Sequence, residues 1–261
     1  MVVGAVLGLV RMIYHVRAIH PERVPAGGGV LMLSNHVSYM DALILAAACP
    51  RPLRFVMWDA LYNVWWMNGF LRYVGTVPIS ATRAKDAVRT VATALKEGGL
   101  VCLFPEGEIT RHGMVNELRK GFELMARQGH AQVMPVWLDG LYGSIFSFQG
   151  GHFFKKRPKQ LRYPATVWFG EPLEAKAGNA AAVRRAMLAM SVASSAAGNA
   201  APAWFSKLPN SFNAPGKWVS ETGYGNLHAH YAAAPFVLMP DEALVIEGEL
   251  PQCRFANLVL W

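Results

Sequence analysis

The sequence predicts an α/β fold, in which helices flank a mixed sheet of mainly parallel strands and a short C-terminal appendage follows. Short apolar runs typical of buried strands alternate along the chain with longer segments of helical periodicity. Glycine and proline residues separate many of these segments, as expected for turns. The chain has 261 residues, 53% hydrophobic and 16% charged, so it can bury a large core and does not have the composition of a disordered protein.

Residues 1–14 are apolar apart from Arg11 and are expected to form a first helix, which is broken from Pro21 onward. The segment is too short to indicate a transmembrane helix. It also has neither the basic start nor the small-residue cleavage site of a signal peptide. Two interpretations stay open with equal weight. The helix either belongs to the core or lies at a membrane interface, with Arg11, His15 and Arg17 near phosphate head groups.

The remaining elements follow from hydrophobic periodicity and from capping residues. Ser34 and Asn35 are good N-cap residues for a helix that ends at Ala48. The other expected helices are residues 61–73, 85–97, 121–128 and 180–194. The expected strands are residues 30–33, 54–57, 77–79, 100–104, 132–137 and 162–169. In such a sheet, functional sites are expected at the carboxyl ends of the strands.

The composition changes after Glu174, where residues 175–203 become rich in alanine, glycine, serine and asparagine. We therefore expect one domain over residues 1–200 and an appendage of unknown role over residues 201–261. The sequence ends within an apolar run at Trp261, so the appendage is expected to be truncated or to pack onto a partner.

The formal net charge is +8 and the isoelectric point is about 9.6, which suits nucleic acid or an anionic membrane surface as a partner. The aromatic content, the apolar excess and the lack of a nucleic-acid-binding module favour the membrane. Three widely spaced cysteines without a Cys-x-x-Cys pair argue against a disulfide framework and a structural zinc, and they suit a reducing compartment.

His36 and Asp41, in the stretch NHVSYMD, are the first candidate catalytic pair. Residues five apart lie about 140° apart around an ideal helix, so the two side chains do not share a helix face. They can meet if His36 lies at the mouth of the helix and turns back. Asp41 would then accept from Nδ1 and leave Nε2 as a base. The alternative is a capping Asn35 and a structural histidine at a helix start, a pattern that recurs by chance.

The second candidate element is the stretch FPEGEITRHG, residues 104–113, which directly follows an expected buried strand. Backbone amides around Gly107, the Thr110 hydroxyl and the Arg111 guanidinium could hold a phosphate, since Arg pairs with phosphate in a bidentate geometry. Taken alone, such a loop is usually only a polar turn. The two elements in this order are a much rarer combination than either one.

With these motifs the chain resembles the glycerolipid acyltransferases of the lysophosphatidic acid acyltransferase (PlsC-like) type. Four blocks occur in the family's order, at residues 35–41, 75–80, 104–111 and 133–136. Residues 139–148, the basic residues after them and residues 167–173 look more specifically like the acyltransferase module of bacterial bifunctional 2-acylglycerophosphoethanolamine acyltransferase/acyl-carrier-protein synthetases. The resemblance covers roughly residues 15–195 and implies a glycerol-3-phosphate acyltransferase-like fold.

The resemblance implies that His36 is the general base, Asp41 its orienting partner, and the acceptor a lysophospholipid or glycerol phosphate. The donor would be an acyl thioester of CoA or of acyl carrier protein, with no metal and no other cofactor. Glu106, Gly107 and Arg111 would carry over as acceptor-binding positions. Asn35, Ser38, Arg83 and Thr110 are further candidate substrate-binding residues. The sequence departs from the family at Ser80 and Ala81, where an arginine is common, and at Glu108, where a small or hydroxyl residue is common.

Two surfaces are candidates for lipid contact. The aromatic residues within 61–71 would face a membrane or an acyl chain, or else form a core helix. Lys155, Lys156 and Arg157, with Lys159 and Arg162, would attract anionic lipid or an acidic carrier protein, or else form a solvated loop. The expected location is the cytoplasmic face of the inner membrane, as a peripheral or monotopic protein.

Two other functions stay open. A thioesterase or lipid hydrolase would use Ser38 or Ser144 with His36, although no Gly-x-Ser-x-Gly elbow is present. A non-catalytic lipid-binding module would be tethered to a partner enzyme through residues 200–261.

Overall fold

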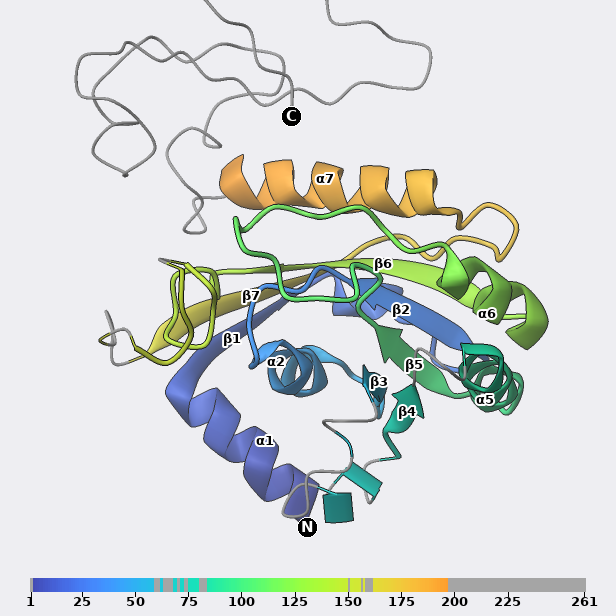
Figure 1. Ribbon diagram of the computed structural model, residues 1–261, viewed down its shortest axis with the longest axis horizontal. Coiled ribbons are helices and arrows are strands. Elements are labelled where there is room, and N and C mark those ends of the chain that lie inside the picture. The colour runs from blue at the N-terminus through green and yellow to red at the C-terminus, as the bar shows by residue number, and fades with distance from the viewer. Residues whose placement is uncertain are drawn as a thin grey trace, which may run out of the picture.

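A computed structural model describes residues 2–58, 62, 68–69, 71–72, 75–79, 84–149, 151–155, 157 and 162–196. Within these residues, seven strands form one sheet in the order β1-β7-β6-β2-β5-β3-β4 (Figure 1). The strands are β1 (Tyr14–Ile19), β2 (Val30–Ser34), β3 (Arg54–Trp58), β4 (Val77–Ile79), β5 (Leu100–Leu103), β6 (Gln132–Asp139) and β7 (Tyr163–Phe169). Neighbouring strands run parallel except β6 and β7, which are antiparallel, so the predicted mixed, mainly parallel sheet is confirmed.

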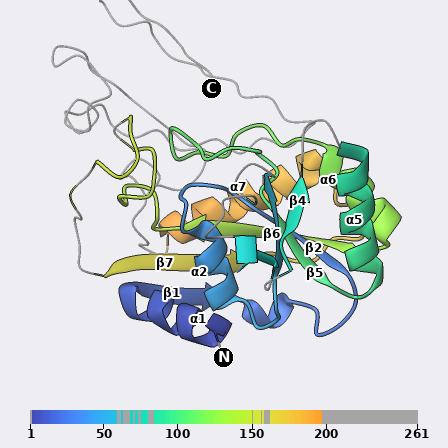
Figure 2. The same ribbon diagram turned by 60° about the horizontal axis from the view of Figure 1, so that its bottom comes forward.

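Helices cover both faces of this sheet (Figures 1 and 2). The helices α1 (Val2–Ile13) and α2 (Asp41–Ala48) pack on one face; α5 (Ala84–Lys96), α6 (Gly121–Gly129) and α7 (Ala180–Ala196) pack on the other. The central strand β2 serves both cores, because its side chains alternate between the faces. Met32 packs with α1 and α2, whereas Leu31 and Leu33 pack with α5 and α6.

The N-terminal prediction was wrong in one respect. The first helix ends at Ile13, and Tyr14–Ile19 forms the edge strand β1, which pairs in parallel with β7. Tyr14 is buried while His15 and Arg17 are exposed, the alternation of a half-buried strand. His15 and Arg17 therefore lie on a sheet edge and not on the helix in which they were expected. A 3-10 turn, Pro21–Arg23, follows.

The start of α2 also differs from the prediction. Ser34 ends strand β2, and α2 begins only at Asp41, with Met40 as its N-cap residue. Residues 35–40 form a loop for two reasons. The side-chain amide of Asn35 is hydrogen-bonded to the backbone of β6, and the Asp41 carboxylate accepts hydrogen bonds from backbone amides of the loop. The other predicted strands and helices within the described residues are confirmed to within two residues at each end.

Four predictions fall wholly or partly outside the described residues. These are Arg83, most of the aromatic segment 61–73, Lys156 and Lys159 of the basic patch, and the whole appendage 201–261 with its boundary near residue 200. None of the helices in the described part of the chain combines the length and the apolar character needed to cross a membrane.

Candidate active site

The two predicted elements meet at one edge of the sheet. The loop after β2 carries His36, the loop after β5 carries Glu106, and a third loop follows β6. Because β2 lies between β5 and β6 and runs parallel to both, all three loops leave the sheet at its carboxyl edge (Figure 1). Segments far apart in the sequence thus form one site.

His36 and Asp41 make the contact that the orienting role requires. Nδ1 of His36 lies 2.8 Å from Oδ2 of Asp41. The same oxygen accepts the backbone amides of Val37 at 2.7 Å and Ser38 at 3.0 Å. A carboxylate is an acceptor only, so this arrangement places the proton on Nδ1 and leaves the lone pair on Nε2. Asp41 is fully buried, which raises the pKa of its carboxyl, while the hydrogen bonds from His36, Ser38 and Val37 act in the opposite direction.

The loop after β5 supports His36 both at its ring and at its backbone. The ring of Phe104 stacks on it, with centroids 4.1 Å apart and planes 15° apart. The amide of Thr110 donates to the His36 carbonyl at 2.8 Å. The His36 side chain remains 21% exposed, and no group among the described residues bonds its Nε2. The only nitrogen free to act as a base is therefore open to a substrate.

Glu106, predicted to bind the acceptor, instead uses both carboxylate oxygens within the protein. Oε1 accepts the amide of His36 at 2.9 Å, and Oε2 accepts the amide of Asn116 at 2.8 Å. The side chain is 3% exposed, and this burial raises the pKa of the carboxyl against the effect of those two amides. Glu106 therefore positions the His36 loop. A direct contact with the acceptor stays a prediction.

Asn35 and Ser38 are also occupied in shaping the loop. The Asn35 side chain donates to the Leu138 carbonyl at 2.9 Å and accepts the Leu138 amide at 2.7 Å, so it continues the ladder between β2 and β6. The Ser38 hydroxyl accepts the amide of Met40 at 3.0 Å. Both side chains are buried. All of these contacts lie within the protein, and the expected roles of Asn35 and Ser38 in substrate binding stay predictions.

Two of the predicted phosphate-binding groups are likewise engaged. The Thr110 hydroxyl donates to the Met114 carbonyl at 2.8 Å, and the Gly107 amide donates to the Phe104 carbonyl at 3.1 Å. Gly107 has a φ of 78°, in the left-handed region that favours glycine. A Cβ there would lie 2.7 Å from Nε of Arg119. These residues fix the shape of the loop around His36.

Arg111 is the predicted anion-binding residue that remains available. Its side chain is exposed, and the guanidinium carbon lies 5.4 Å from the centroid of the Phe148 ring. Tyr142 donates to its backbone carbonyl at 3.0 Å, which holds the loop in place. Arg111 thus stands at the rim of the site, where it can meet a phosphate.

The sequence analysis missed the part that the loop after β6 plays in the site. Ser38 and Ser147 form an antiparallel bridge, and the amide of Tyr39 donates to the Phe146 carbonyl at 3.2 Å. From the sequence, the stretch 139–148 was considered for its resemblance to a family and for Ser144 as a candidate nucleophile. Its run of aromatic residues near glycines could have indicated a third loop of the site.

The described geometry gives no support to a serine nucleophile. The Ser38 hydroxyl points to the amide of Met40, and the buried Ser144 hydroxyl has no hydrogen-bond partner among the described residues. The hydrogen bond of the His36 ring goes to Asp41 and to neither serine.

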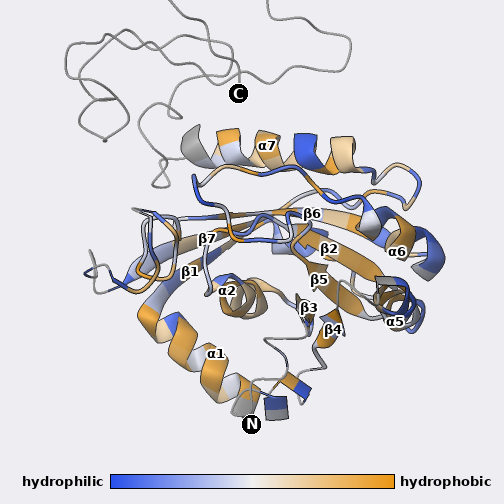
Figure 3. Ribbon diagram, viewed as in Figure 1, coloured by the Kyte–Doolittle hydropathy of each residue, from blue (hydrophilic) through white to orange (hydrophobic). Residues whose placement is uncertain are grey.

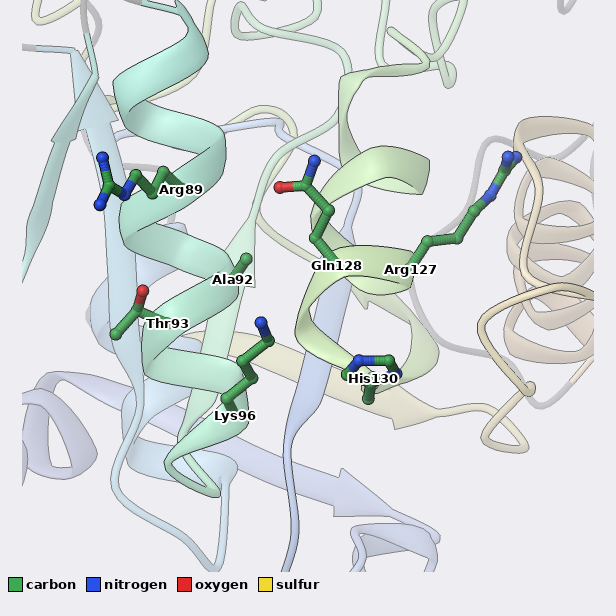
Figure 4. A pocket seen from close by; sticks show the side chains of 7 residues that line it. All are labelled: Arg89, Ala92, Thr93, Lys96, Arg127, Gln128 and His130. Carbon is green, nitrogen blue, oxygen red and sulfur yellow. The ribbon is translucent and has the colours of Figure 1, made fainter.

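A cavity of about 460 Å³ lies between α5 and α6, away from His36. Its lining residues are Arg89, Ala92, Thr93, Lys96, Arg127, Gln128 and His130 (Figure 4). Lys96 and His130 lie at the ends of helices that lead directly into β5 and β6, so the cavity opens at the amino edge of the sheet. The side chains of Arg89 and Arg127 point away from each other in Figure 4, which argues against a shared anion.

Comparison with known proteins identifies the part of the chain that holds the site. Residues 15–139, which include His36, Asp41 and the loop of Glu106, match the model of the family described as Acyltransferase. The chain carries an acyltransferase domain. The loop that supplies the aromatic residues after Asp139 lies beyond the matched part of this acyltransferase domain.

Curated relatives agree with this assignment. The chain is 25% identical over 160 residues to a 1-acyl-sn-glycerol-3-phosphate acyltransferase of Bacillus subtilis, covering 60% of this chain and 73% of the relative. It is 27% identical over 120 residues to the protein of the same name from Borreliella burgdorferi, covering 45% of this chain and 48% of that relative. The acyltransferase domain thus makes this chain an enzyme of the acyltransferase class.

Among solved structures, the chain is similar to the 1-acyl-sn-glycerophosphate (LPA) acyltransferase PlsC from Thermotoga maritima. The TM-score is 0.55 at 20% sequence identity, covering 72% of this chain and 76% of that chain. At this identity the likeness establishes the fold of the acyltransferase domain and leaves its substrates to be inferred.

Proposed function

We propose that this acyltransferase transfers a fatty acyl group from an acyl thioester to the free hydroxyl of a lysophospholipid or glycerol-phosphate acceptor, in phospholipid synthesis or remodelling. The observation that carries the proposal is the His36 ring, whose Nδ1 is 2.8 Å from Asp41 and whose Nε2 is open. The names of the curated relatives support a lysophosphatidic acid acceptor.

In the proposed step, Nε2 of His36 takes the proton of the acceptor hydroxyl as its oxygen attacks the thioester carbonyl. The new ester C–O bond forms, the C–S bond breaks, and the thiolate takes the proton back from His36. Asp41 stabilises the imidazolium between these two proton transfers. Backbone amides of the surrounding loops stabilise the oxyanion that forms from the thioester carbonyl oxygen. The step calls for no metal and no cofactor beyond the donor, which is acyl-CoA or an acyl carrier protein thioester.

Arg111 is proposed to bind the acceptor phosphate at the rim of the site, since its guanidinium is exposed and can form a bidentate pair. Glu108, also exposed, adds a negative charge to the same loop and is proposed to influence the choice of head group. The expected resemblance of residues 139–148 and 167–173 to the bifunctional 2-acylglycerophosphoethanolamine enzymes stays a prediction, and it would favour a phosphoethanolamine head group.

We propose that the enzyme acts at the cytoplasmic face of the cell membrane, as a peripheral or monotopic protein. Helix α1 supports contact with a membrane, because it is largely hydrophobic (Figure 3) and exposes Leu9 by 51%, Met12 by 68% and Ile13 by 44%. The net charge of +8 favours an anionic surface.

The test is an acyl-transfer assay with acyl-CoA and with acyl carrier protein thioester, over a panel of lysophospholipids. His36→Ala is compared with His130→Ala, a histidine at the opposite edge of the sheet. We expect transfer to depend on the acceptor and to be lost only in His36→Ala. Full activity in His36→Ala contradicts the mechanism, and thioester hydrolysis without any acceptor dependence identifies a hydrolase instead. A folded protein that is inactive with both donors in the presence of membranes indicates a lipid-binding module.

A further inference from the structure

Five aromatic side chains form a continuous cluster beside the His36 loop. Tyr39 stacks on Phe154, with ring centroids 5.5 Å apart, and meets Phe153 edge-on at 4.9 Å. Phe146 lies 5.8 Å from Phe154, and Phe148 lies 5.0 Å from Phe153. We call these five residues the aromatic cluster. It joins the loop of the candidate catalytic pair to the loop after β6.

The outer side of the aromatic cluster is open to solvent. Tyr39 is 49% exposed and Phe154 is 61% exposed, although their rings stack on each other. Phe154 also has a φ of 62°, and the amide of Lys155 donates across it to the Phe153 carbonyl at 2.8 Å. This tight turn is a strained conformation for a residue other than glycine. A strained turn that holds a large ring in water indicates a functional contact.

Exposed cations border the aromatic cluster. The Arg111 guanidinium lies 5.4 Å from the Phe148 ring on one side. Lys155 follows Phe154 directly, Arg157 comes two residues later, and both are exposed. Exposed aromatic rings bordered by basic side chains match the surface of an anionic bilayer, where rings lie among the head groups and cations meet the phosphates.

We propose that the aromatic cluster, with Arg111, Lys155 and Arg157, is the surface on which this enzyme rests against an anionic phospholipid bilayer. The proposal rests on the proposed function, because the acceptor there is a lysophospholipid held in the same bilayer. Tyr39 precedes Asp41 by two residues, and its amide is bonded to Phe146. A bilayer that contacts the cluster therefore lies next to His36, and an acceptor hydroxyl can reach Nε2 without leaving the lipid.

Vesicle flotation without substrate tests this surface. The triple variant Phe154→Ser/Lys155→Ser/Arg157→Ser removes one exposed ring and two exposed cations. Its matched control, Leu124→Ser/Arg89→Ser/Lys96→Ser, removes one exposed apolar side chain and two exposed cations from α5 and α6. On phosphatidylcholine vesicles that contain phosphatidylglycerol, we expect the triple variant to bind at least about tenfold more weakly than the wild type. We expect the control to bind as the wild type, and Phe154→Trp to retain binding because it keeps a ring at the interface.

Wild-type vesicle binding by the triple variant overturns the proposal. If the α1 variant Leu9→Ser/Met12→Ser detaches from the vesicles instead, α1 is the membrane contact. If the triple variant selectively loses transfer from acyl carrier protein, the cluster is a site for an acidic protein. The proposed function is tested separately, since flotation needs no catalysis. If the chain binds vesicles through the cluster but transfers no acyl group, the proposed function is contradicted while the proposed membrane-contact surface is supported.

Discussion

The carboxylate of Glu106 accepts a hydrogen bond from the backbone amide of His36 at 2.9 Å, although the two residues lie 70 positions apart. Its other oxygen accepts the amide of Asn116 at 2.8 Å. One buried side chain therefore joins the loop after β2 to the loop after β5. The position of the candidate base depends on this junction as well as on Asp41.

Replacing Glu106 by alanine should weaken both the fold and the reaction. The amides of His36 and Asn116 lose their acceptor, so we expect the free energy of unfolding to fall by about 1–3 kcal/mol. We expect kcat to fall by about tenfold to a hundredfold, because the imidazole is less well placed. Chemical denaturation and initial rates measure the two effects. Glu117→Ala, an exposed residue in the same connection, is the control and should leave both unchanged. Wild-type kcat in Glu106→Ala would contradict the positioning role.

The raised pKa of Glu106 predicts a pH-dependent difference in stability between the wild type and Glu106→Gln. Burial raises this pKa above its ordinary value of 4.5, so the folded state takes up the proton more readily than the unfolded chain. The stabilisation from that proton is complete below the pKa that Glu106 has in the unfolded chain. It is lost as the pH rises through the pKa that Glu106 has in the folded protein. We expect the free energy of unfolding of the wild type to rise relative to that of Glu106→Gln as the pH falls from neutral toward 4.5. Denaturation midpoints over that range measure the difference, and a constant difference contradicts the prediction.

Asp41→Asn should separate activity from stability. The amide has the same size, and it removes a buried charge that burial disfavours, so the free energy of unfolding should change by less than about 2 kcal/mol. Asparagine can donate to Nδ1 and so favour the wrong tautomer of His36. We therefore expect kcat to fall by about two to four orders of magnitude. Rates and unfolding curves are measured on the same preparation. A parallel loss of stability and activity would make Asp41 a structural residue.

Gly107→Ala tests whether the loop after β5 needs its left-handed residue. A side chain at a φ of 78° is strained, and its Cβ would lie 2.7 Å from Nε of Arg119. We expect a loss of about 1–2 kcal/mol in the free energy of unfolding, together with lower activity. Gly121→Ala is the matched control, because a Cβ there meets nothing within 4 Å. Equal effects of the two substitutions on thermal unfolding would count against a specific role of Gly107.

The sequence was sufficient to predict most of the fold and the pairing of His36 with Asp41. Short buried strands such as β2 and amphipathic helices such as α5 have periodicities that depend on local residues alone. The edge strand β1 was missed because its apolar neighbour α1 leads into it without a glycine or proline. The start of α2 was misplaced because the Asn35 side chain pairs with Leu138 in β6, a contact between residues 103 positions apart.

The roles of several site residues could not be predicted, because they depend on contacts between loops. Glu106 and Thr110 both belong to a motif that resembles a phosphate-binding loop. In the structure, the Glu106 carboxylate accepts the His36 amide, and the Thr110 hydroxyl donates to the Met114 carbonyl within its own loop. The Phe104 ring contacts His36, and the aromatic cluster forms around Tyr39, only when three strands bring their loops to the carboxyl edge of the sheet.

The most direct test of the account is the rate of acyl transfer from acyl-CoA to a lysophospholipid by His36→Ala, measured with and without added imidazole. If Nε2 of His36 is the base, the rate should fall by about two to four orders of magnitude, and imidazole should restore part of it. The unfolding curve of the variant should match that of the wild type. Undiminished transfer by folded His36→Ala would contradict the account.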